Sequence, residues 1–408
     1  MYQEPKTKAL ARKALKYLKD FLNIEANGGV ILLVITALTL IIANSSLFTF
    51  YNEIWHSSFT VKILNLEFSY SLHFIINEIL MTLFFLVVGI EIRQEIYNGS
   101  LSDLKQASLP VIAAIGGVVA PALIFLSLNT ESLLRQGWAV PTATDIAFAV
   151  GILSLIKKHI PSNLRVFLLT LAIIDDIIAV LIIAIFYSNG INYHGFLFVA
   201  FGIGIMLLLR ALRANYLYMI PMIIIWGGLF VASIHPTLAG IIIGLLMPVG
   251  YKNTNSPETQ SLPVGEKVQK LLHPWVTYLI IPLFAFANAG INISNINFEA
   301  NGSILLITTI IVALVVGKPF GIFISSFIAV RLGFCKLPAN IRWQHILLVG
   351  LLAGIGFTMS IFIALLGFAN ALDLLESCKF AILVGSLIAS VLGLSWGLFC
   401  SRKANIEN

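Results

Sequence analysis

Long apolar runs separated by short polar stretches dominate the sequence. A helix that crosses the core of a bilayer needs about 20 mostly apolar residues, and runs of roughly this length recur along the whole chain. They lie at residues 28–47, 70–92, 107–128, 138–156, 164–187, 195–209, 216–234, 236–250, 271–290, 303–330, 343–368 and 380–399. The pattern predicts an all-α membrane protein with about 12 transmembrane helices.

The segments outside these runs are short. Residues 1–27 are basic with apolar positions at helical spacing, which predicts either a cytoplasmic amphipathic segment on the anionic inner leaflet or a solvated tail that sets the topology. We expect no cleaved signal peptide, because the first apolar run is long enough to span. Residues 28–400 are then a single domain of about 12 membrane-spanning helices, and residues 401–408 are a cytoplasmic tail.

The outer loop 48–69 has a different pattern. Apolar and polar residues alternate from Phe59 to Phe68, which is typical of a short β-hairpin. Such a hairpin either pairs with the same edge of a second copy, giving a homodimer, or caps a monomer.

Composition and charge agree with a membrane protein. Of the 408 residues 59% are hydrophobic and 11% are charged, whereas soluble domains have about 25% charged residues. With the N-terminus in the cytoplasm, all but four of the 25 Lys and Arg residues fall on the cytoplasmic side; Lys62, Arg135 and Lys379 lie outside and Lys318 lies within a span. Basic residues are retained in cytoplasmic loops, so we expect both termini there. This excess of cytoplasmic basic residues explains the net charge of +6, so the charge does not indicate a nucleic-acid partner.

Several function classes lack their sequence motifs. The chain has no GxxxxGK[ST] phosphate-binding loop and no HExxH zinc motif. We find no pair of a nucleophile and a base for an intramembrane enzyme, and we expect no cofactor. Transport would therefore draw its energy from an ion gradient.

Five ionisable residues lie well inside the apolar spans, away from their ends: Glu78, Asp145, Asp175, Asp176 and Lys318. A charge near the centre of a membrane helix costs roughly 2.5–3.5 kcal/mol on insertion scales. One lysine neutralises only one carboxylate, and burial favours the protonated form of the others. These acids therefore suit a site that exchanges a proton for a cation; the alternative is a purely structural ion pair.

The adjacent acids in LAIIDDIIAV cannot face the same point, because neighbours on a helix point about 100° apart. One of them should line the ion cavity, while the other finds a partner. A hard monovalent cation prefers oxygen ligands, which carboxylates and freed backbone carbonyls supply.

Two spans carry signals for a broken helix. Pro141 and the run Thr142–Thr144 precede Asp145 in the fourth span, and Gly354 and Gly356 precede Thr358 in the eleventh. Broken helices at membrane depth line a cavity or are buried in protein. Asp145 would compensate their positive N-termini, and Lys318 would compensate their negative C-termini. The alternative for the glycine pair is a helix packing contact.

Seven segments together resemble the NhaA family of bacterial sodium/proton antiporters. They run in the family order from residue 77 to residue 364 and read NEILMTLFFLVVGIEIRQE, ATDIAFAVGILSL, LAIIDDIIAVLIIAIFYS, HPTLAGIIIGLLMP, LHPWVTYLIIPLFAFANAG, VGKPFGIF and GIGFTMSIFIA. The resemblance implies a multi-pass protein of the bacterial inner membrane with twelve helices. It also implies inverted repeats of spans 3–5 and 10–12, with broken helices crossing in spans 4 and 11.

The resemblance also implies roles for individual residues. Asp176 is the main ligand shared by Na⁺ and H⁺, Asp175 lies beside it as the partner of Lys318, and Thr144 and Asp145 belong to the broken fourth span. Further residues are implied in a cytoplasmic funnel or in the pH response: Glu78, Glu91, Glu95 and His235. On physical grounds Glu91 and Glu95 fit solvated helix ends equally well, and a lone histidine such as His235 is usually a hydrogen-bonded interfacial residue.

The sequence departs from the family pattern at two positions. Glu78 stands where family members often have Asp, and Gln269 stands where an acid implicated in the pH response is expected. Both departures concern residues implied in the pH response. The resemblance therefore predicts the residues of the ion site but not the pH profile of transport.

The function that follows is secondary antiport of Na⁺, or Li⁺, against H⁺ by alternating access. Na⁺ and H⁺ compete for Asp176, so we expect transport to rise with alkalinity. The first rival is a cation channel, which needs a ring of selectivity ligands. The second is a proton-coupled symporter of an organic solute, which needs a larger polar cavity.

Overall fold

The computed structural model describes residues 6–63, 66–102, 104–156, 161–188, 192–212, 217–249, 263–296, 298 and 302–406. The longer helices are α1 (Lys6–Ala43), α4 (Met81–Asn98), α5 (Leu104–Leu128), α8 (Ser162–Phe186), α9 (Tyr193–Ala211), α15 (Lys318–Arg331) and α18 (Leu372–Ile406). The shorter ones are α2 (Phe48–His56), α3 (Leu72–Phe74), α6 (Ser132–Arg135), α7 (Ile146–Leu155), α10 (Met219–Val231), α11 (Leu238–Leu246), α12 (Val264–Trp275), α13 (Ile281–Asn288), α14 (Ser303–Val312), α16 (Trp343–Ala353) and α17 (Phe357–Gly367). Short 3₁₀ turns are η2 (Ser100–Ser102), η3 (Val140–Thr142) and η7 (Ile293–Asn295), and π turns are η1 (Ile75–Leu80), η6 (Val276–Ile280) and η8 (Ala313–Gly317).

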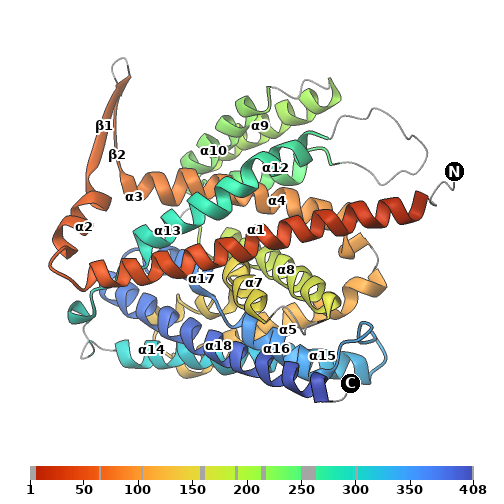
Figure 1. Ribbon diagram of the computed structural model, residues 1–408. Helices are drawn as coiled ribbons and strands as arrows, with labels where there is room; N and C mark the ends of the chain where they lie inside the picture. Colours follow the sequence, from red (N-terminus) through yellow and green to blue (C-terminus); the bar gives the residue numbers. More distant parts are fainter. Residues whose placement is uncertain are drawn as a thin grey trace.

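The helices form one bundle, with the start of α1 and the end of α18 at the same end (Figure 1). The hairpin β1 (Ser58–Ile63) and β2 (Leu66–Ser71) projects from the opposite end. Its strands are antiparallel, with Ser58 opposite Ser71 and Ile63 opposite Leu66. The hairpin predicted from the alternating pattern is therefore confirmed. The sequence pattern did not predict α2, which precedes it.

The number of helices suited to a bilayer is smaller than the sequence pattern predicted. Among the described residues, seven helices are long and apolar enough to cross a membrane, and three bent pairs raise that number to ten. The difference arises at α10 and α11, with 13 and 9 residues, which are shorter than the roughly 17–25 residues of a full crossing. A multi-pass membrane protein is thus supported, whereas twelve spans stay a prediction.

Both ends of the predicted transporter domain fall within continuous helices. α1 has 38 residues and passes residue 27 without a break, and α18 has 35 residues and passes residue 400. The division at these positions stays a prediction.

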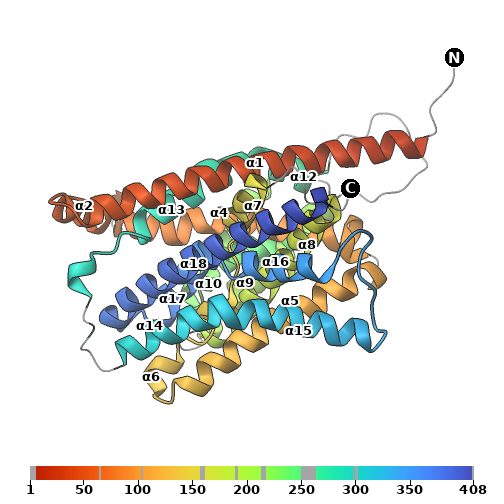
Figure 2. The ribbon, with the colours of Figure 1, turned by 60° about the horizontal axis from the view of Figure 1, so that its bottom comes forward.

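Glycines allow several helices to approach one another at backbone distance. A methyl group built on Gly321 of α15 would lie 2.1 Å from Gly116 O of α5, and one on Gly240 of α11 would lie 2.2 Å from Thr82 O of α4. Small residues at helix contacts are typical of membrane proteins, where close van der Waals packing drives helix association. Close packing brings α5, α15 and α8 together around the interior of the bundle (Figure 2).

Two segments in the interior interrupt helices. Residues 143–145 separate η3 from α7 across a 45° bend, and residues 354–356 separate α16 from α17 across a 46° bend. A third irregularity is the π turn η8, which directly precedes Lys318 and Pro319. Proline has no backbone N–H to donate, and wider turns of this kind recur at functional positions.

Candidate ion-binding site

The adjacent acids Asp175 and Asp176 lie in the middle of α8 with only 1% and 5% of their surface exposed. Their side chains point about 100° apart around the helix axis. They therefore meet different surroundings, as the sequence predicted for two neighbours on one helix.

Asp175 is engaged by two side chains. Its Oδ2 atom lies 2.9 Å from Lys318 Nζ and accepts a hydrogen bond of 2.7 Å from Thr144 Oγ1. Lys318, the first residue of α15, is fully buried, and its ammonium also donates to Thr142 O at 2.5 Å. That carbonyl closes η3, so the lysine compensates both a carboxylate and the negative end of a short helix. This is the pairing that the family resemblance implied.

Asp176 has different surroundings. It lines a narrow cavity of about 50 Å³, and within the described part of the chain no hydrogen bond or ion pair engages its carboxylate. The polar residues that line the same cavity are Glu25, Glu91, Thr144, Asp145, His273, Thr277 and Thr358. The cavity is large enough for a small cation with one or two waters, since a water occupies about 30 Å³ in the liquid.

Asp145 joins the two interrupted segments. Its backbone N–H donates to Ile355 O at 2.7 Å. Its Oδ1 atom accepts from Phe148 N at 3.0 Å, in the first turn of α7, and its Oδ2 atom accepts from Thr358 N at 3.1 Å, in the first turn of α17. The Thr358 hydroxyl also donates to Oδ2. One carboxylate therefore caps two helices, where negative charge is favourable.

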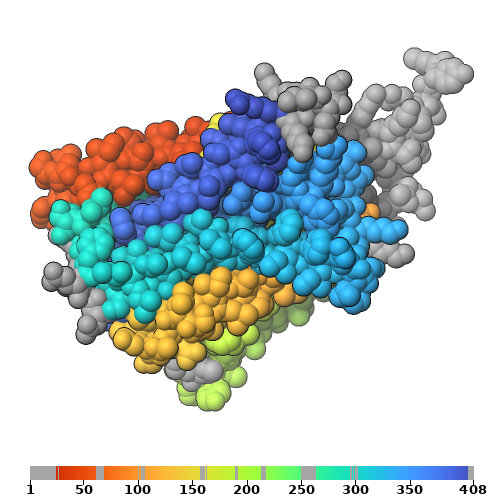
Figure 3. Space-filling model, turned by 90° about the horizontal axis from the view of Figure 1, so that it is seen from below, coloured from red at the N-terminus to blue at the C-terminus, as the bar shows by residue number. Residues whose placement is uncertain are grey.

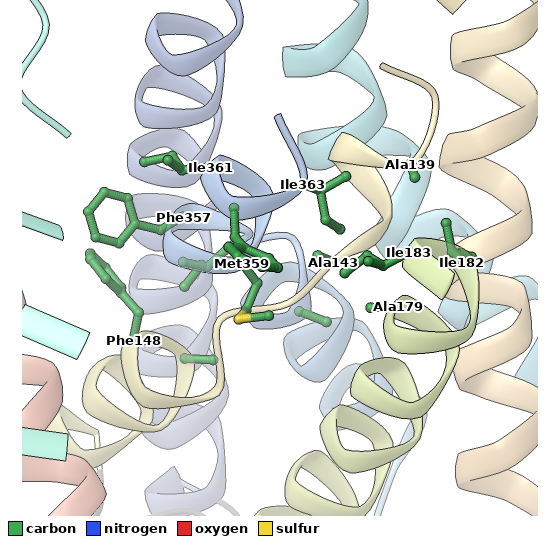
Figure 4. Packing of buried hydrophobic residues seen from close by; sticks show 14 of the residues in the cluster. Ala139, Ala143, Phe148, Ala179, Ile182, Ile183, Phe357, Met359, Ile361 and Ile363 are labelled. Carbon is green, nitrogen blue, oxygen red and sulfur yellow. The ribbon is translucent and has the colours of Figure 1, made fainter. Parts of the chain in front are cut away.

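The region around this crossing is closely packed. In Figure 4 the side chains of Ala143, Met359 and Ile183 gather around the extended segment that leads into α7. On the side of the crossing nearer the hairpin, Ala139, Ile183 and Ile363 are at most 1% exposed. Apolar packing thus closes that side of the site.

A second polar cluster lines the cavity toward the end of the bundle where α1 begins. His273 Nε2 lies 3.0 Å from Glu25 Oε1 and 3.9 Å from Glu91 Oε1. Gln269 Nε2 donates to Glu91 Oε1 at 3.3 Å, and Gln94 Nε2 donates to Gln269 Oε1 at 2.6 Å. Three helices, α1, α4 and α12, contribute to this cluster.

The other residues named from the sequence lie away from the cavity. Glu95 is one turn beyond Glu91 on α4, and Glu78 lies in η1, near the opposite end of the same span. His235 lies in the connection between α10 and α11, with Nε2 3.1 Å from Tyr187 O. Burial lowers the pKa of His235 below its ordinary value, so its ring is neutral in the folded protein at neutral pH.

Comparisons with known proteins identify the family of the chain. A family model described as "Na+/H+ antiporter 1" matches residues 19–396. The chain belongs to this family. A Na⁺/H⁺ antiporter NhaA of Bordetella petrii is 45% identical, with 98% of this chain and 94% of the relative covered. The antiporters of the same name from Cupriavidus necator and Janthinobacterium sp. are each 46% identical over 98% of this chain, with 93% and 96% of their own lengths covered.

Membership of the Na⁺/H⁺ antiporter 1 family fixes the general class of the protein. These relatives are named as transporters and not as enzymes. Together with the apolar helices of the structure, family membership indicates a multi-pass protein of the bacterial inner membrane.

Within this antiporter fold, sequence reasoning missed Glu25 and the capping role of Thr358. Glu25 lies near the end of the basic segment 1–27, which we interpreted as either a membrane-surface helix or a solvated tail, and it precedes the Gly28–Gly29 pair of the first apolar run by three residues. An acid within one turn of an apolar run is the signal that would have identified it. Thr358 was noted only as the position near a helix break.

Proposed function

We propose that this protein is a secondary antiporter that exchanges intracellular Na⁺, or Li⁺, for external H⁺ at Asp176. The observation that carries the proposal is the contrast between the two acids of α8. Lys318 and Thr144 engage Asp175, while Asp176 is buried against a cavity and has no such partner in the described ranges. An uncompensated acid at membrane depth marks an ion pathway far more often than a structural element.

Competition at one carboxylate couples the two fluxes. Asp176 binds either a proton or Na⁺, which is the transported substrate and prefers oxygen ligands. Asp175 supplies a second buried carboxylate beside it, and its Oδ1 atom has no hydrogen-bond partner among the described residues. Thr144 and Asp145 border the same cavity. Because the two substrates exclude each other, protons suppress Na⁺ binding at acid pH. Na⁺ binding recovers as the pH rises and Asp176 loses its proton.

Alternating access requires that the site open to one side at a time. The polar cluster of Glu25, Glu91 and His273 lines the cavity on one side of Asp176, whereas buried apolar residues occupy the other side. The basic residues favour the cytoplasm for the first side. This conformation therefore supports a site that receives its substrate from the cytoplasm, and movement at the two interrupted segments would open it to the outside.

The finer architecture is part of the same proposal. It comprises twelve spans, inverted repeats of spans 3–5 and 10–12 that cross at the interruptions near Asp145 and Gly356, and cytoplasmic termini. Glu91 and Glu95 would form the cytoplasmic funnel, with Glu78 and His235 contributing to the pH response. A second copy would pair through loop 48–69, where the hairpin presents an open strand edge.

The cavity argues against transport of an organic solute. Pockets for small organic molecules usually enclose about 300–1,000 Å³, and the space beside Asp176 is only about 50 Å³. An ion fits this space.

The test is Na⁺-induced proton movement in proteoliposomes, followed with a pH-sensitive dye across a pH series. We expect exchange by the wild type, none by Asp176→Asn, and normal exchange by Asp373→Asn. Asp373 lies in the exposed first turn of α18 and controls for loss of an acid as such. If Asp176→Asn inserts, folds and still exchanges, Asp176 is not the shared ligand. Uncoupled Na⁺ flux in the wild type would instead indicate a channel.

A further inference from the structure

A second hollow lies on the flank of the bundle, separate from the ion cavity. α1 and α18 form its sides, and α7 and α17 form its floor. Figure 3 shows α1 and α18 next to each other on one face of the molecule. Its volume is about 290 Å³, close to the lower limit of about 300 Å³ for small-molecule pockets. We call this hollow the flank groove; its lining includes Leu33, Leu40, Phe148, Phe357, Leu383 and Leu387.

The flank groove is poor in polar groups. Thr36 and Ser386 are its only polar lining side chains among the described residues, and both are already bonded. Thr36 Oγ1 donates to Leu32 O at 2.7 Å, and Ser386 Oγ accepts from Phe357 N at 3.1 Å. Water needs two to four polar partners to occupy a buried site. The groove has room for about ten water volumes, but its chemistry suits hydrocarbon.

The groove continues into the surface that faces lipid. On α1, Val34 and Leu38 are 54% and 50% exposed, and on α18, Leu387 and Val391 are 63% and 55% exposed. Large apolar side chains with this exposure, on helices of a multi-pass membrane protein, contact the acyl chains of the bilayer. An acyl chain can therefore enter the groove sideways without crossing a polar surface.

We propose that the flank groove binds one acyl chain of a membrane phospholipid. The chain lies against Phe148 and Phe357, whose ring centres are 5.5 Å apart at 62° to each other. Both residues stand in the first turn of a helix that Asp145 caps. The acyl chain thus packs behind the ion site, because Phe357 is directly before Thr358 and Phe148 is three residues after Asp145 in the chain. This binding is independent of whether Na⁺ is the transported ion.

The test uses a phosphatidylethanolamine with a photoreactive diazirine in the middle of one acyl chain. The full-length protein is reconstituted with this lipid and irradiated, and the labelled peptides are identified by mass spectrometry. We expect label concentrated on Leu33–Leu40 and on residues 380–387. Ala37→Phe should remove that label, because Ala37 is an exposed lining residue and the phenyl ring fills the groove. Val34→Phe is the matched control on the same helix, and it should leave the label in place.

Several results would overturn the proposal. One is label spread evenly over α1 and α18, and another is equal labelling of Ala37→Phe and Val34→Phe. If Ala37→Phe does not fold, Val384→Phe fills the same groove from α18. A photoreactive benzoylphenylalanine at position 387 tests the rival occupant. Protein dimers on a denaturing gel would place a second copy over the groove, whereas a mass increase of one lipid supports the proposal.

Discussion

The two helix caps made by Asp145 lead to a prediction that can be measured as an interaction energy. Thr358→Val removes the hydroxyl that donates to Asp145 Oδ2 but keeps the backbone N–H. A hydrogen bond to a charged group contributes about 1.5–3 kcal/mol, so this variant should lose about that much stability. A Thr→Val control is Thr308→Val, since Thr308 Oγ1 is exposed and donates only to Ile304 O of its own helix.

Asp145→Asn should be more damaging than Thr358→Val. The side-chain amide introduced by this change has only one oxygen, so it can accept from only one of the two helix starts. Its NH₂ group then faces another hydrogen-bond donor, at either Phe148 N or Thr358 N. Loss of one cap contributes about 0.5–2 kcal/mol, and loss of the charge between two helix N-termini adds up to about 2 kcal/mol for each in a partly buried setting. We therefore expect about 3–5 kcal/mol in total.

The double variant isolates the contact between the two residues. Both single changes remove the hydrogen bond from the Thr358 hydroxyl to a charged group. The sum of their two losses of stability should therefore exceed the loss in the double variant Asp145→Asn/Thr358→Val by about 1.5–3 kcal/mol. Thermal unfolding in detergent measures all four proteins. Additive shifts in melting temperature, with Thr358→Val equal to Thr308→Val, would refute the idea that Asp145 holds the start of α17.

Three further predictions concern other parts of the molecule. Lys318→Gln should destabilise the protein by about 3–5 kcal/mol, because it leaves Asp175 buried without its counter-charge; a melting temperature equal to that of wild type would contradict this. Burial lowers the pKa of His235, so the unfolded chain binds that proton more readily and stability falls as the pH drops below the ordinary value of 6.5. His235→Gln should flatten this part of the curve of melting temperature against pH. Gly321→Ala should prevent the contact of α15 with Gly116 O and reduce the yield of folded protein, while Gly204→Ala, which meets nothing within 4 Å, should not.

The sequence drew attention to the central residues of the proposed site because charges are rare in apolar spans. Asp145, Asp175, Asp176 and Lys318 were each found in this way, and the structure brings Asp175 and Lys318 into contact. Residue spacing alone could not say which of the two adjacent acids faces the lysine, since that depends on the rotation of α8 relative to α15. The family resemblance supplied that choice.

Features that depend on tertiary contacts were harder to predict. Glu25 lies in the basic segment 1–27, for which the sequence analysis considered only a membrane-surface helix or a solvated tail, yet the chain folds it against His273. The apolar runs at residues 216–234 and 236–250 predicted full spans, but α10 and α11 are shorter helices. The hairpin was predictable because strand alternation is a local pattern, whereas nothing in the local pattern indicated α2.

The backbone hydrogen bond from Asp145 N to Ile355 O has a consequence for how the crossing can change during evolution. Main-chain atoms make this bond, so any residue at position 355 preserves the acceptor, and any residue except proline at position 145 preserves the donor. Substitutions at position 145 can therefore change the side-chain caps, and the stability that they contribute, while this main-chain bond is kept. The crossing thus has one contact that evolution can hold constant while it varies the side chains around it.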